Sequence, residues 1–481
     1  MFPEVKLWTD AVRSTMQPNC QQARDVAYQL HPYTNARSHQ EAGPLIIERG
    51  NGSYVFDTAG NRYLDAMAGL WSVGLGFSEK RLIEAAHRQM QVLPFYHTFA
   101  SRSNGPSIEL AEKLVKMSPV PMSKVFFTNS GSEANDTVLK LIAYRSNALC
   151  QPQRKKVISC LRGYHGVTIA AASLTGLPHN HRSFDLPLPN ILHTGSPHFY
   201  KDGRPGESEE TFATRRAEEL ESLIQHEGPD TIAAFFAEPV MGAGGVIVPP
   251  PTYWDKIQTV LKQHSILLVA DEVICGFGRT GTMFGCETYG IAPDVIVVSK
   301  QLTSSYFPLS AIIMNDSMFE PIAEESNRVG VLAHGFTGGG HPVGAAIAIE
   351  NIKLIEEREL IANSSRIGSY MQERLRTLSD HPLVGEVRGV GLIAAIELVL
   401  DKERKVAAAT LGDVGTFASR LMLEQGIIVR NIDDALAICP PLIVNKDQID
   451  ALFDGITGML HELEATVVNL SRSGQVPTRP V

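Results

Sequence analysis

The stretch ILLVADEVICGFGRTG, residues 266–281, decides how this sequence of 481 residues is interpreted. Its apolar start predicts a buried strand over Ile266–Ala270, and the carboxylate of Asp271 follows directly. In open α/β sheets, ligands bind beyond the carboxyl ends of the strands. Asp271 is therefore either an ordinary capping or surface acid, or a charge aimed into a site.

The glycines of the same stretch, Gly276, Gly278 and Gly281, spell G-x-G-x-x-G, the pattern of a dinucleotide-binding loop. Such a loop has its first glycine at the end of a strand and its third inside a helix. Here DEVIC separates the strand from the first glycine, and TMFGCETYGIAP, which follows the third, holds two more glycines and a proline. These residues disfavour a long helix, so the pattern favours a turn.

Residues 75–315 alternate short apolar segments with helical patterns. Buried strands are predicted at Val125–Phe127, Val157–Cys160, Ile232–Ala237, Ile266–Ala270 and Val295–Val298. Helices are predicted between them, for example at Glu133–Asn147 and Tyr253–His264. This alternation predicts an α/β fold with a parallel sheet covered on both faces. The polar segment 195–216, which is interrupted by glycine and proline, is expected to be a surface excursion.

The two ends of the chain have different patterns. Residues 1–50 are polar and irregular and are expected to form an arm, whereas 53–76 read as a hairpin region. Beyond residue 335 the pattern is that of a smaller α+β domain, and 471–481 are expected to be a frayed tail. In this domain we predict helices at Pro342–Glu357, Ile361–Leu378, 413–424 and 446–464, and strands at 390–398, 426–430 and 435–439.

We therefore expect three segments. Residues 1–74 form the N-terminal arm and part of a small domain, 75–335 a large domain, and 336–481 the C-terminal small domain.

Composition excludes several classes of protein. Hydrophobic residues make up 44% and charged residues 20%, as in globular enzymes. The net charge of -9 and the lack of a basic run argue against a nucleic-acid or membrane surface. Six scattered cysteines predict reduced thiols and no metal site. The first residues lack the features of a signal peptide and no apolar run is long enough to span a membrane, so a cytoplasmic enzyme is expected.

The segment VFFTNSGSEANDTVLKL (125–141) reads as a strand, a loop of small residues and an amphipathic helix. Ser130, Gly131 and Ser132 stand at the predicted helix start, where free N–H groups and the helix dipole favour an anion. The alternative is an ordinary N-cap completed by Glu133. In the context of the other features, we favour a phosphate site.

In the segment VIVVSKQLTSSYFPLS (295–310), Lys300 follows a fully apolar strand. Desolvation there lowers the pKa of a lysine and makes it a suitable nucleophile for a Schiff base. A phosphate site, a carboxylate and such a lysine together describe a pyridoxal-phosphate site. In it, the carboxylate keeps the pyridine nitrogen protonated and the lysine carries the cofactor.

From about residue 40 to 465 the sequence resembles the class III aminotransferases of the fold type I pyridoxal-phosphate enzymes. The motifs TNSGSEAND, YHG, AEPV, DEVICGFGRTG, SKQLTSSY and HGFTGGGHP occur in the family's order. The resemblance implies an α/β fold, with a mostly parallel seven-stranded sheet in the large domain that binds pyridoxal phosphate, and a smaller α+β domain. It also implies a homodimer with shared active sites, or a tetramer built from it.

The resemblance implies roles for particular residues. Lys300 is implied to form the Schiff base and Asp271 to pair with the pyridine nitrogen, and these two are the catalytic residues. Phe336 and Thr337 are expected to reach the phosphate across the dimer interface. The full set of implied cofactor-binding residues is Ser130, Gly131, Ser132, Tyr164, His165, Gly166, Glu238, Asp271, Val273, Lys300, Phe336 and Thr337.

The segments LDAMAGLWSVGLGF (64–77) and QMQVLPFYHTF resemble the amine:pyruvate, or omega-, transaminases. There Trp71 and Tyr164 are implied to line the substrate pocket. In GIIVR, Arg430 stands where the family keeps a mobile arginine for the carboxylate of the acceptor, and a surface arginine is the alternative.

Five positions depart from related patterns. The ornithine and γ-aminobutyrate branches carry a glutamate and a glutamine where this chain has Ala243 and Ile274, which predicts a more apolar pocket suited to amines. The amine:pyruvate pattern often has glycine where Gln301 stands, and a Tyr-Ser pair in place of Gly338 and Gly339, which predicts a larger pocket or a looser loop.

The sequence thus predicts a pyridoxal-phosphate-dependent transaminase. It is expected to move an amino group from a primary amine, an omega-amino acid or a diamine to pyruvate or a similar 2-oxo acid by a ping-pong mechanism. A racemase, aminomutase or lyase on the same fold is the main alternative. A non-catalytic homologue and a nicotinamide dehydrogenase are less favoured, because Lys300 and Asp271 are both present.

Overall fold

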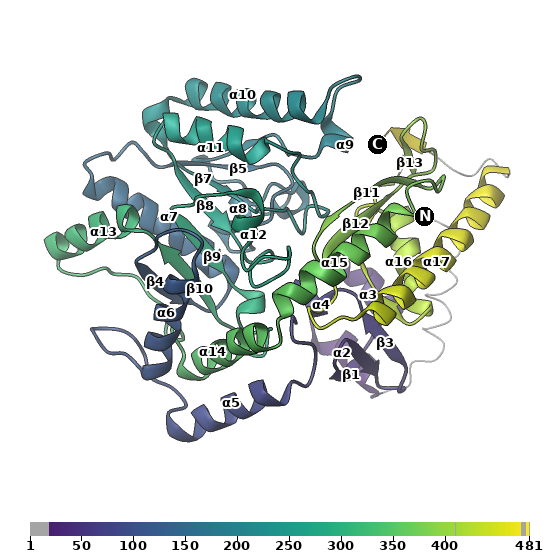
Figure 1. Ribbon diagram of the computed structural model, residues 1–481, viewed down its shortest axis with the longest axis horizontal. Coiled ribbons are helices and arrows are strands. Elements are labelled where there is room, and N and C mark those ends of the chain that lie inside the picture. Colours follow the sequence, from purple (N-terminus) through teal and green to yellow (C-terminus); the bar gives the residue numbers. More distant parts are fainter. Residues whose placement is uncertain (1–18, 409, 473–477, 481) are drawn as a thin grey trace.

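The computed structural model describes residues 19–408, 410–472 and 478–480. Its centre is a seven-stranded sheet (Figure 1). Only the strand over Ser310–Met314 runs antiparallel to its neighbours, as expected for a mostly parallel sheet. In order across the sheet, the strands are β4 (Lys124–Thr128), β10 (Ser310–Met314), β9 (Val295–Val298), β8 (Leu267–Asp271), β7 (Ile232–Ala237), β5 (Lys156–Cys160) and β6 (Ile191–Thr194).

The central strands are apolar throughout because both faces of the sheet are covered. In β8, Leu268 and Ala270 pack into one apolar cluster, whereas Leu267 and Val269 pack into another on the opposite face. Helices complete the two layers, with α7 contributing to one cluster and α10 and α11 to the other (Figure 1). The helices of this region are α5 (Lys80–Val92), α6 (Gly105–Met117), α7 (Gly131–Ala148), α8 (Ile169–Leu174), α9 (Phe199–Asp202), α10 (Glu209–Glu227), α11 (Tyr253–Gln263), α12 (Gly285–Tyr289), α13 (Asp316–Val329) and α14 (Pro342–Glu357).

The predicted strands and helices of this region are confirmed to within one or two residues. The ranges of β6 and β10 had not been identified in the sequence. The prediction of a surface excursion over 195–216 is wrong, because this segment contains α9 and the start of α10. Helix α10 buries Phe212 and Ala213 against the sheet, a helical period that the many polar residues of the segment conceal.

A second region is built from two smaller sheets. One is antiparallel, in the order β11-β12-β16-β15, and the other has the order β1-β2-β3-β14. Helices α15 and α17 lie along this region, to the right in Figure 1. The elements are α4 (Ala68–Trp71), α15 (Leu360–Arg376), α16 (Asp413–Glu424), α17 (Lys446–Arg472), β1 (Ile47–Asn51), β2 (Tyr54–Asp57), β3 (Arg62–Asp65), β11 (Val384–Val390), β12 (Ile393–Leu398), β13 (Val406–Ala408), β14 (Ile427–Ile428), β15 (Arg430–Ile432) and β16 (Ala435–Ile438).

Strand β14 pairs in parallel with β3, so the N-terminal hairpin and the C-terminal third of the chain share one sheet. The hairpin of β2 and β3 confirms the interpretation of 53–76. The segment boundaries at 74/75 and 335/336 stay a prediction. Within the described residues, every helix is too short or too polar to cross a membrane. All six cysteines are free thiols, as expected.

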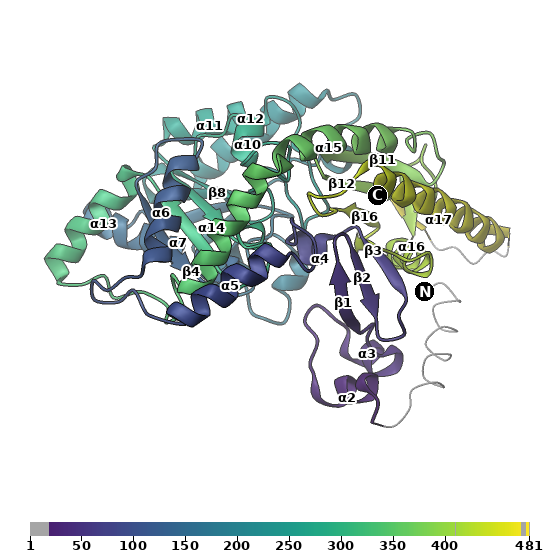
Figure 2. The same cartoon turned by 60° about the horizontal axis from the view of Figure 1, so that its bottom comes forward.

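Two predictions at the ends of the chain are wrong. Residues 1–18 lie outside the described part, but the rest of the predicted irregular arm contains α2 (Gln21–Tyr28), α3 (Ala36–Ala42) and β1. Figure 2 shows α2 and α3 beyond the β1–β2–β3 sheet. The predicted frayed tail begins as the end of α17, and β17 (Thr478–Pro480) pairs with β13. Capping by Cys20 and Asn35 starts the two short helices, a signal that the polar composition concealed.

Candidate active site

A cavity of ≈ 320 Å³ lies beyond the carboxyl ends of the central strands. It is within the size range of small-molecule sites, and this edge of the sheet is where such sites occur in open α/β folds. Eleven of the residues implied by the resemblance line it: Trp71, Gly131, Ser132, Tyr164, His165, Gly166, Glu238, Asp271, Val273, Lys300 and Arg430.

Asp271 ends β8 and is 3% exposed. Its Oδ2 accepts hydrogen bonds from Asn135 Nδ2 and His165 Nδ1, both at 2.9 Å, and its Oδ1 accepts one from the backbone of Val273 at 3.1 Å. Burial lowers the pKa of the His165 imidazole, but the hydrogen bond and charge of Asp271 outweigh burial, and the net shift is upward. The site therefore holds a buried carboxylate that stabilises the protonated form of the neighbouring imidazole.

Lys300 begins a 3-10 turn two residues after β9 and lines the same cavity. Burial lowers the pKa of its ammonium group, and the charges of Asp271 and Glu238 only partly oppose this. A lowered pKa leaves more of the amine neutral at a given pH, which is what a nucleophilic lysine requires. The backbone of Lys300 has φ 45°, a left-handed conformation that is uncommon for a lysine.

Glu238 follows β7 and forms a second buried carboxyl group in the cavity wall. It accepts backbone hydrogen bonds at 2.9 Å from Tyr164 and from Gly242, so it fixes the loop that presents the Tyr164 ring. Burial raises its pKa to about 7, with the charge of Asp271 adding to the effect and that of His165 opposing it.

The N-terminus of α7 contributes Gly131 and Ser132 to the cavity wall. The side chain of Ser130 does not line the cavity, because its Oγ accepts a hydrogen bond from the Glu133 backbone at 3.2 Å as the N-cap. Glu133 reaches back to the Asn129 backbone at 2.8 Å. The capping alternative is thus realised by Ser130 and Glu133, and the free helix end remains available for an anion beside Gly131.

Several residues that line the cavity or support its wall were not identified from the sequence. Tyr33, from the loop between α2 and α3, meets the edge of the Tyr164 ring with centroids 6.5 Å apart. Asn135 supports Asp271 from one helical turn inside α7, and it stands in the quoted motif TNSGSEAND. The spacing of Asn135 from Gly131 on one helix could have identified it, whereas nothing local links Tyr33 to the cavity. The remaining newly identified lining residues are Leu70, Leu177, His179, Ser299, Asn431, Ile432 and Asp433.

Arg430 reaches the cavity because the predicted strand 426–430 is divided. Ile427–Ile428 belong to β14 in one small sheet, whereas Arg430 begins β15 in the other. Burial lowers the pKa of the Arg430 guanidinium. Among the described residues, no carboxylate forms an ion pair with it. Asp433, which also lines the cavity, instead pairs with Arg162 at 3.4 Å. An unpaired guanidinium in a cavity is a site for an anionic group.

The glycine loop that follows Asp271 is a structural connection. After it comes only the five-residue helix α12, which rules out a pyrophosphate-binding helix. Within the loop, the fully buried Arg279 donates to Gln301 Oε1 at 2.7 Å and to the carbonyl of Leu392 at 2.9 Å. Gln301 in turn donates to the carbonyls of Gly276 and Phe277. Gln301 therefore ties the loop to the turn that carries Lys300.

The segment HGFTGGGHP lies away from this cavity. Phe336 lines a second cavity and Thr337 is exposed, so neither reaches the site of its own chain. The expectation that Gly338 and Gly339 enlarge the pocket or loosen the loop stays a prediction, but both glycines lie in tightly packed surroundings. A Cβ at Gly338 would lie 2.6 Å from Asn129 Oδ1, and one at Gly339 would lie 2.8 Å from the Phe127 carbonyl oxygen. Tight packing explains these two glycines.

The residues present fit pyridoxal phosphate. A free helix end suits its phosphate, the carboxylate of Asp271 suits a protonated ring nitrogen, and Lys300 suits its aldehyde. The indole N–H of Trp71 is buried and has no partner within the described residues, although Trp71 lines the cavity. Gly166 has φ 136°, and a Cβ there would lie 2.5 Å from Ser132 Oγ, so a glycine closes the cavity wall where the loop after β5 meets the start of α7.

Comparisons with known proteins agree with this chemistry. The model of the class-III aminotransferases matches residues 34–460. Gamma aminobutyrate transaminase 1, mitochondrial, of Solanum lycopersicum is 47% identical over 92% of this chain and 86% of its own length. Vanillin aminotransferase of Capsicum annuum is 46% identical over 92% and 96%. The crystal structure of the omega transaminase from Pseudomonas jessenii in complex with PMP has a TM-score of 0.92 and 57% identity, over 93% of this chain and 99% of that one.

Proposed function

The chain belongs to the class-III aminotransferases, a family that uses pyridoxal phosphate, and we propose that its acceptor is pyruvate or a similar 2-oxo acid and its donor a primary amine. An omega-amino acid or a diamine is included among the donors. Amino transfer follows from the family. The single observation that carries the choice of substrates is Arg430, a cavity guanidinium without a carboxylate partner in the described part of the chain.

Arg430 supports a carboxylate-bearing acceptor. A guanidinium binds a carboxylate through two parallel hydrogen bonds, and a 2-oxo acid supplies one. Since Ala243 and Ile274 line the cavity where polar partners would otherwise stand, the remainder of the wall favours an apolar group on the donor. The two half-reactions would then use one pocket, with Arg430 engaged only when the acceptor is bound.

Among the omega-amino acids, γ-aminobutyrate is a specific candidate donor. Relatives named as gamma aminobutyrate transaminases are 47% identical to this chain, and γ-aminobutyrate also carries a carboxylate that Arg430 could bind. The apolar Ala243 and Ile274 favour a donor without a carboxylate instead. The two donors differ in one testable respect, because only γ-aminobutyrate needs the guanidinium in the donor half-reaction.

We assign roles in the chemistry to residues of the cavity wall. The cofactor supplies an electron sink when bound, which stabilises negative charge on the carbon that bears the amino group. Lys300 would hold the cofactor and move the proton at that carbon, since burial lowers the pKa of its ammonium group and so favours the neutral amine that can accept a proton. Asp271, oriented by Asn135 and His165, holds the proton on the ring nitrogen.

The remaining roles concern binding. The N-terminal residues of α7, Gly131 and Ser132, would hold the phosphate, while Tyr164 and Val273, which line the same cavity, would hold the ring. The hydrogen bonds of Glu238 orient Tyr164, and Trp71 shapes the donor side of the cavity.

The substrate proposal is tested with a panel of donors and the variant Arg430→Gln. Purified enzyme is given arylalkyl amines, diamines, β-alanine, taurine or γ-aminobutyrate with pyruvate, and alanine is measured. Alanine formation also separates transamination from racemase or lyase activity. In single half-reactions followed by cofactor absorbance, Arg430→Gln should slow the step with pyruvate and leave the step with a carboxylate-free amine unchanged. Equal slowing of both steps would contradict the assigned role of Arg430.

The role of Lys300 is tested by Lys300→Ala. This variant should lose both the visible absorption band of the lysine-bound cofactor and turnover, because no other amine attaches the cofactor there. Lys262→Ala, which removes an exposed lysine of α11, should keep both and serves as the matched control. If Lys300→Ala kept the band and turnover, the assigned role of Lys300 would be wrong.

Assembly and compartment complete the proposal. A homodimer, or a tetramer built from it, would bring Phe336 and Thr337 to the site of the neighbouring chain, which accounts for their distance from the cavity of their own. Light scattering of the holoenzyme tests this, with a monomer as the contrary result. We propose a cytoplasmic location, although the names of several relatives place those proteins in mitochondria or chloroplasts. Fractionation of the source cells tests it.

A further inference from the structure

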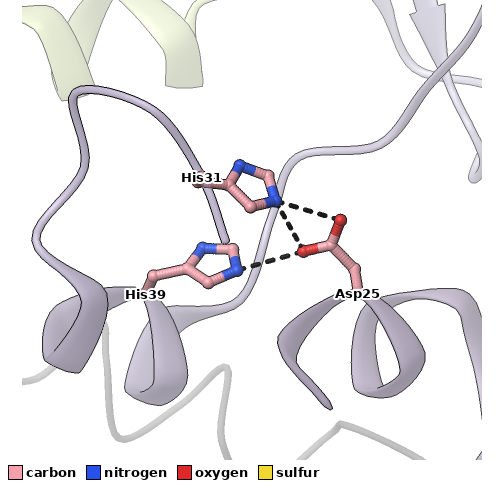
Figure 3. A group of neighbouring side chains, drawn as sticks. All are labelled: Asp25, His31 and His39. Atoms are coloured by element: carbon pink, nitrogen blue, oxygen red, sulfur yellow. Dashed lines mark hydrogen bonds and ion pairs between the residues drawn. The ribbon is translucent and has the colours of Figure 1, made fainter. Parts of the chain in front are cut away.

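Two histidines and an aspartate meet between the first two helices of the described chain. Figure 3 shows the imidazoles of His31 and His39 directed at one carboxylate of Asp25. The Nε2 atoms of His31 and His39 lie 2.8 and 3.0 Å from Asp25 Oδ1. The ring centroids of the two histidines are 4.2 Å apart. None of these residues belongs to the cavity described above.

The cluster is assembled by the fold from three separate parts of the chain. Asp25 stands on α2, His31 in the connecting loop and His39 on α3. Among the residues that the structure describes, it is the only group of three His, Cys, Asp or Glu side chains whose ligand atoms lie within 4.8 Å of one another. The intervals of five and seven residues between them match no common metal motif, so the sequence alone had predicted no metal.

The donor set and its spacing suit a tetrahedral cation. Zinc forms bonds of about 2.0–2.1 Å to histidine nitrogen and carboxylate oxygen. In tetrahedral geometry, two such ligand atoms lie about 3.3 Å apart. The two measured separations of 2.8 and 3.0 Å require only a small opening of the cluster. Two imidazoles and one carboxylate favour Zn²⁺ over Mg²⁺ or Ca²⁺, which prefer oxygen ligands.

The cluster is also accessible. The side chains of His31, Asp25 and His39 are 27%, 16% and 9% exposed, so solvent can supply a fourth ligand. His31 and His39 line a small cavity between α2 and α3, through which an ion can enter.

The loop that carries His31 also carries Tyr33 to the active site. The hydroxyl of Tyr33 accepts a hydrogen bond from Asn180 Nδ2 at 2.5 Å, and its ring meets Tyr164 and His179. Because α2, α3 and the loop share few buried apolar residues, a cross-link between them would restrict this loop more than packing does.

We propose that Asp25, His31 and His39 form a Zn²⁺ site that holds residues 29–35, and with them Tyr33, at the wall of the active-site cavity. The ion is structural, and it touches neither the cofactor nor the substrate. The site stands outside the cavity, so this proposal holds or fails independently of the substrates proposed above.

Metal binding is the first test. Holoenzyme made without a histidine tag and freed of metal is titrated with Zn²⁺ by calorimetry, and with Co²⁺ as an absorbing probe that Zn²⁺ should displace. We expect one ion per chain. His39→Gln and Asp25→Asn should each weaken binding by at least about tenfold, since even the loss of an outer partner of a metal ligand has such an effect. Retention of the cofactor absorption band shows that each variant is folded.

The control is His264→Gln, which alters a histidine paired with a single carboxylate, Glu221, at 2.8 Å. It should bind Zn²⁺ like the unaltered enzyme. Lack of binding at one ion per chain, or unchanged affinity in both His39→Gln and Asp25→Asn, would overturn the site and leave a hydrogen-bonded cluster.

The link to Tyr33 has its own readout. Zn²⁺ should slow amide hydrogen exchange within residues 29–35 of the unaltered holoenzyme and should have no such effect in His39→Gln. If Zn²⁺ binds without changing exchange in that loop, the site is retained but its proposed action on Tyr33 is refuted.

Discussion

At the scale of single residues, the buried charge of Arg279 is held by uncharged partners. Arg279 is fully buried, and its described hydrogen bonds go to the side chain of Gln301 and to the carbonyls of Leu392 and Pro440. Burial lowers the pKa of Arg279, which reflects the cost of keeping that charge away from water. Gln301 therefore has a structural reason to replace the glycine often found after the family's lysine.

This reasoning predicts the effect of Gln301→Ala. Removing the amide leaves a buried guanidinium without one acceptor and frees the carbonyls of Gly276 and Phe277. We expect a loss of about 2–3 kcal/mol in the free energy of unfolding, because each buried unsatisfied group costs about 1–3 kcal/mol. Urea unfolding measures the loss. Gln91→Ala, on the exposed face of α5, should change little, and equal effects of the two substitutions would contradict the account.

At the scale of elements, the start of α7 and the loop that follows β5 are fitted to each other. Ser132 Oγ accepts a hydrogen bond from the Val167 backbone at 3.0 Å, and Asp136 accepts one from the Ala171 backbone at 2.8 Å. Between these contacts, Gly166 approaches the helix more closely than any residue with a side chain could. The helix end assigned to the phosphate thus depends on one glycine of the YHG motif.

Gly166→Ala should therefore weaken cofactor binding as well as stability. Its φ of 136° is unfavourable for alanine, and the added Cβ would lie 2.8 Å from the backbone of Ser132. Gly60→Ala is the matched control, because Gly60 has φ 87° but open space around its Cβ position. We expect about 1 kcal/mol of destabilisation from conformation alone in the control, and more in Gly166→Ala. Thermal unfolding measures the stability of each variant, and cofactor retention after dialysis measures its cofactor binding. Equal values for the two variants would argue against the close approach of Gly166 to α7.

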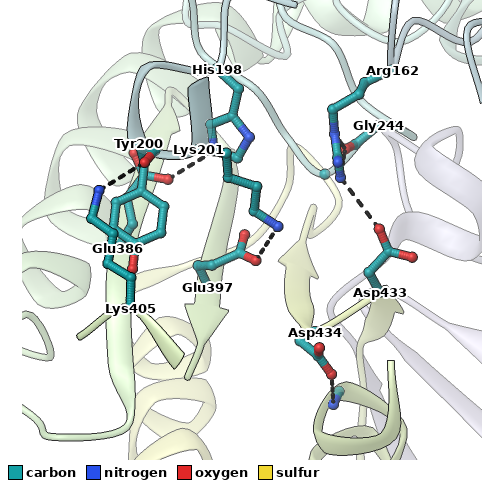
Figure 4. Close-up of polar contacts among 12 residues, drawn as sticks. Arg162, His198, Tyr200, Lys201, Gly244, Glu386, Glu397, Lys405, Asp433 and Asp434 are labelled. Carbon is teal, nitrogen blue, oxygen red and sulfur yellow. Dashed lines mark hydrogen bonds and ion pairs between the residues drawn. The ribbon is translucent and has the colours of Figure 1, made fainter. Parts of the chain in front are cut away.

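At the scale of the whole molecule, a buried ionic network joins the central sheet's region to the antiparallel sheet. Figure 4 shows Lys201 of α9 directed at Glu397 of β12. Lys201 Nζ and Glu397 Oε1 are 2.6 Å apart. Glu397 also pairs with Arg388 of β11 at 2.9 Å. Burial raises the pKa of Glu397, but Arg388 and Lys201 outweigh it and leave the pKa at about 2. Arg162 and Asp433 form a second contact between the same regions (Figure 4).

The pKa of Glu397 predicts a pH dependence of stability. The pKa is depressed from the ordinary value of 4.5, so its contribution is fully present above pH 4.5 and is lost as the pH falls toward 2. Glu397→Gln should lower the free energy of unfolding by about 3 kcal/mol at pH 7, because it leaves Arg388 buried with fewer negative partners. The difference from the unaltered enzyme should shrink between pH 4.5 and pH 2.

Urea unfolding of both proteins at pH 7, 4 and 3 measures this dependence. Glu112→Gln provides a control, since Glu112 pairs with Lys116 on the exposed face of α6 and should contribute little at any pH. A difference between Glu397→Gln and the unaltered enzyme that stays constant with pH would contradict the role of the charge.

Local patterns predicted much of the central region. Strands such as Val295–Val298 are apolar throughout because both faces are buried, and this property is visible in the sequence. Asp271 and Lys300 follow two such strands, and this position identified them as candidate site residues. Both line the same cavity. The polar segment 195–216 was wrongly predicted to be a surface excursion. Helix α10, which begins in it, buries only one narrow face, so exposed polar residues dominate the composition of the segment.

The sequence by itself determined the fold class and the residues that follow the central strands, because these depend on the order of apolar and polar residues along the chain. The family was identified separately, by the resemblance of its motifs. The tertiary structure alone decided which contacts form between segments that are distant in the sequence. It divided 426–430 between two sheets, which turns Arg430 into the cavity, and it brought Tyr33 against Tyr164. It also assembled Asp25, His31 and His39 from two helices and a loop. Such contacts depend on how elements pack in space, which no periodicity within one element records.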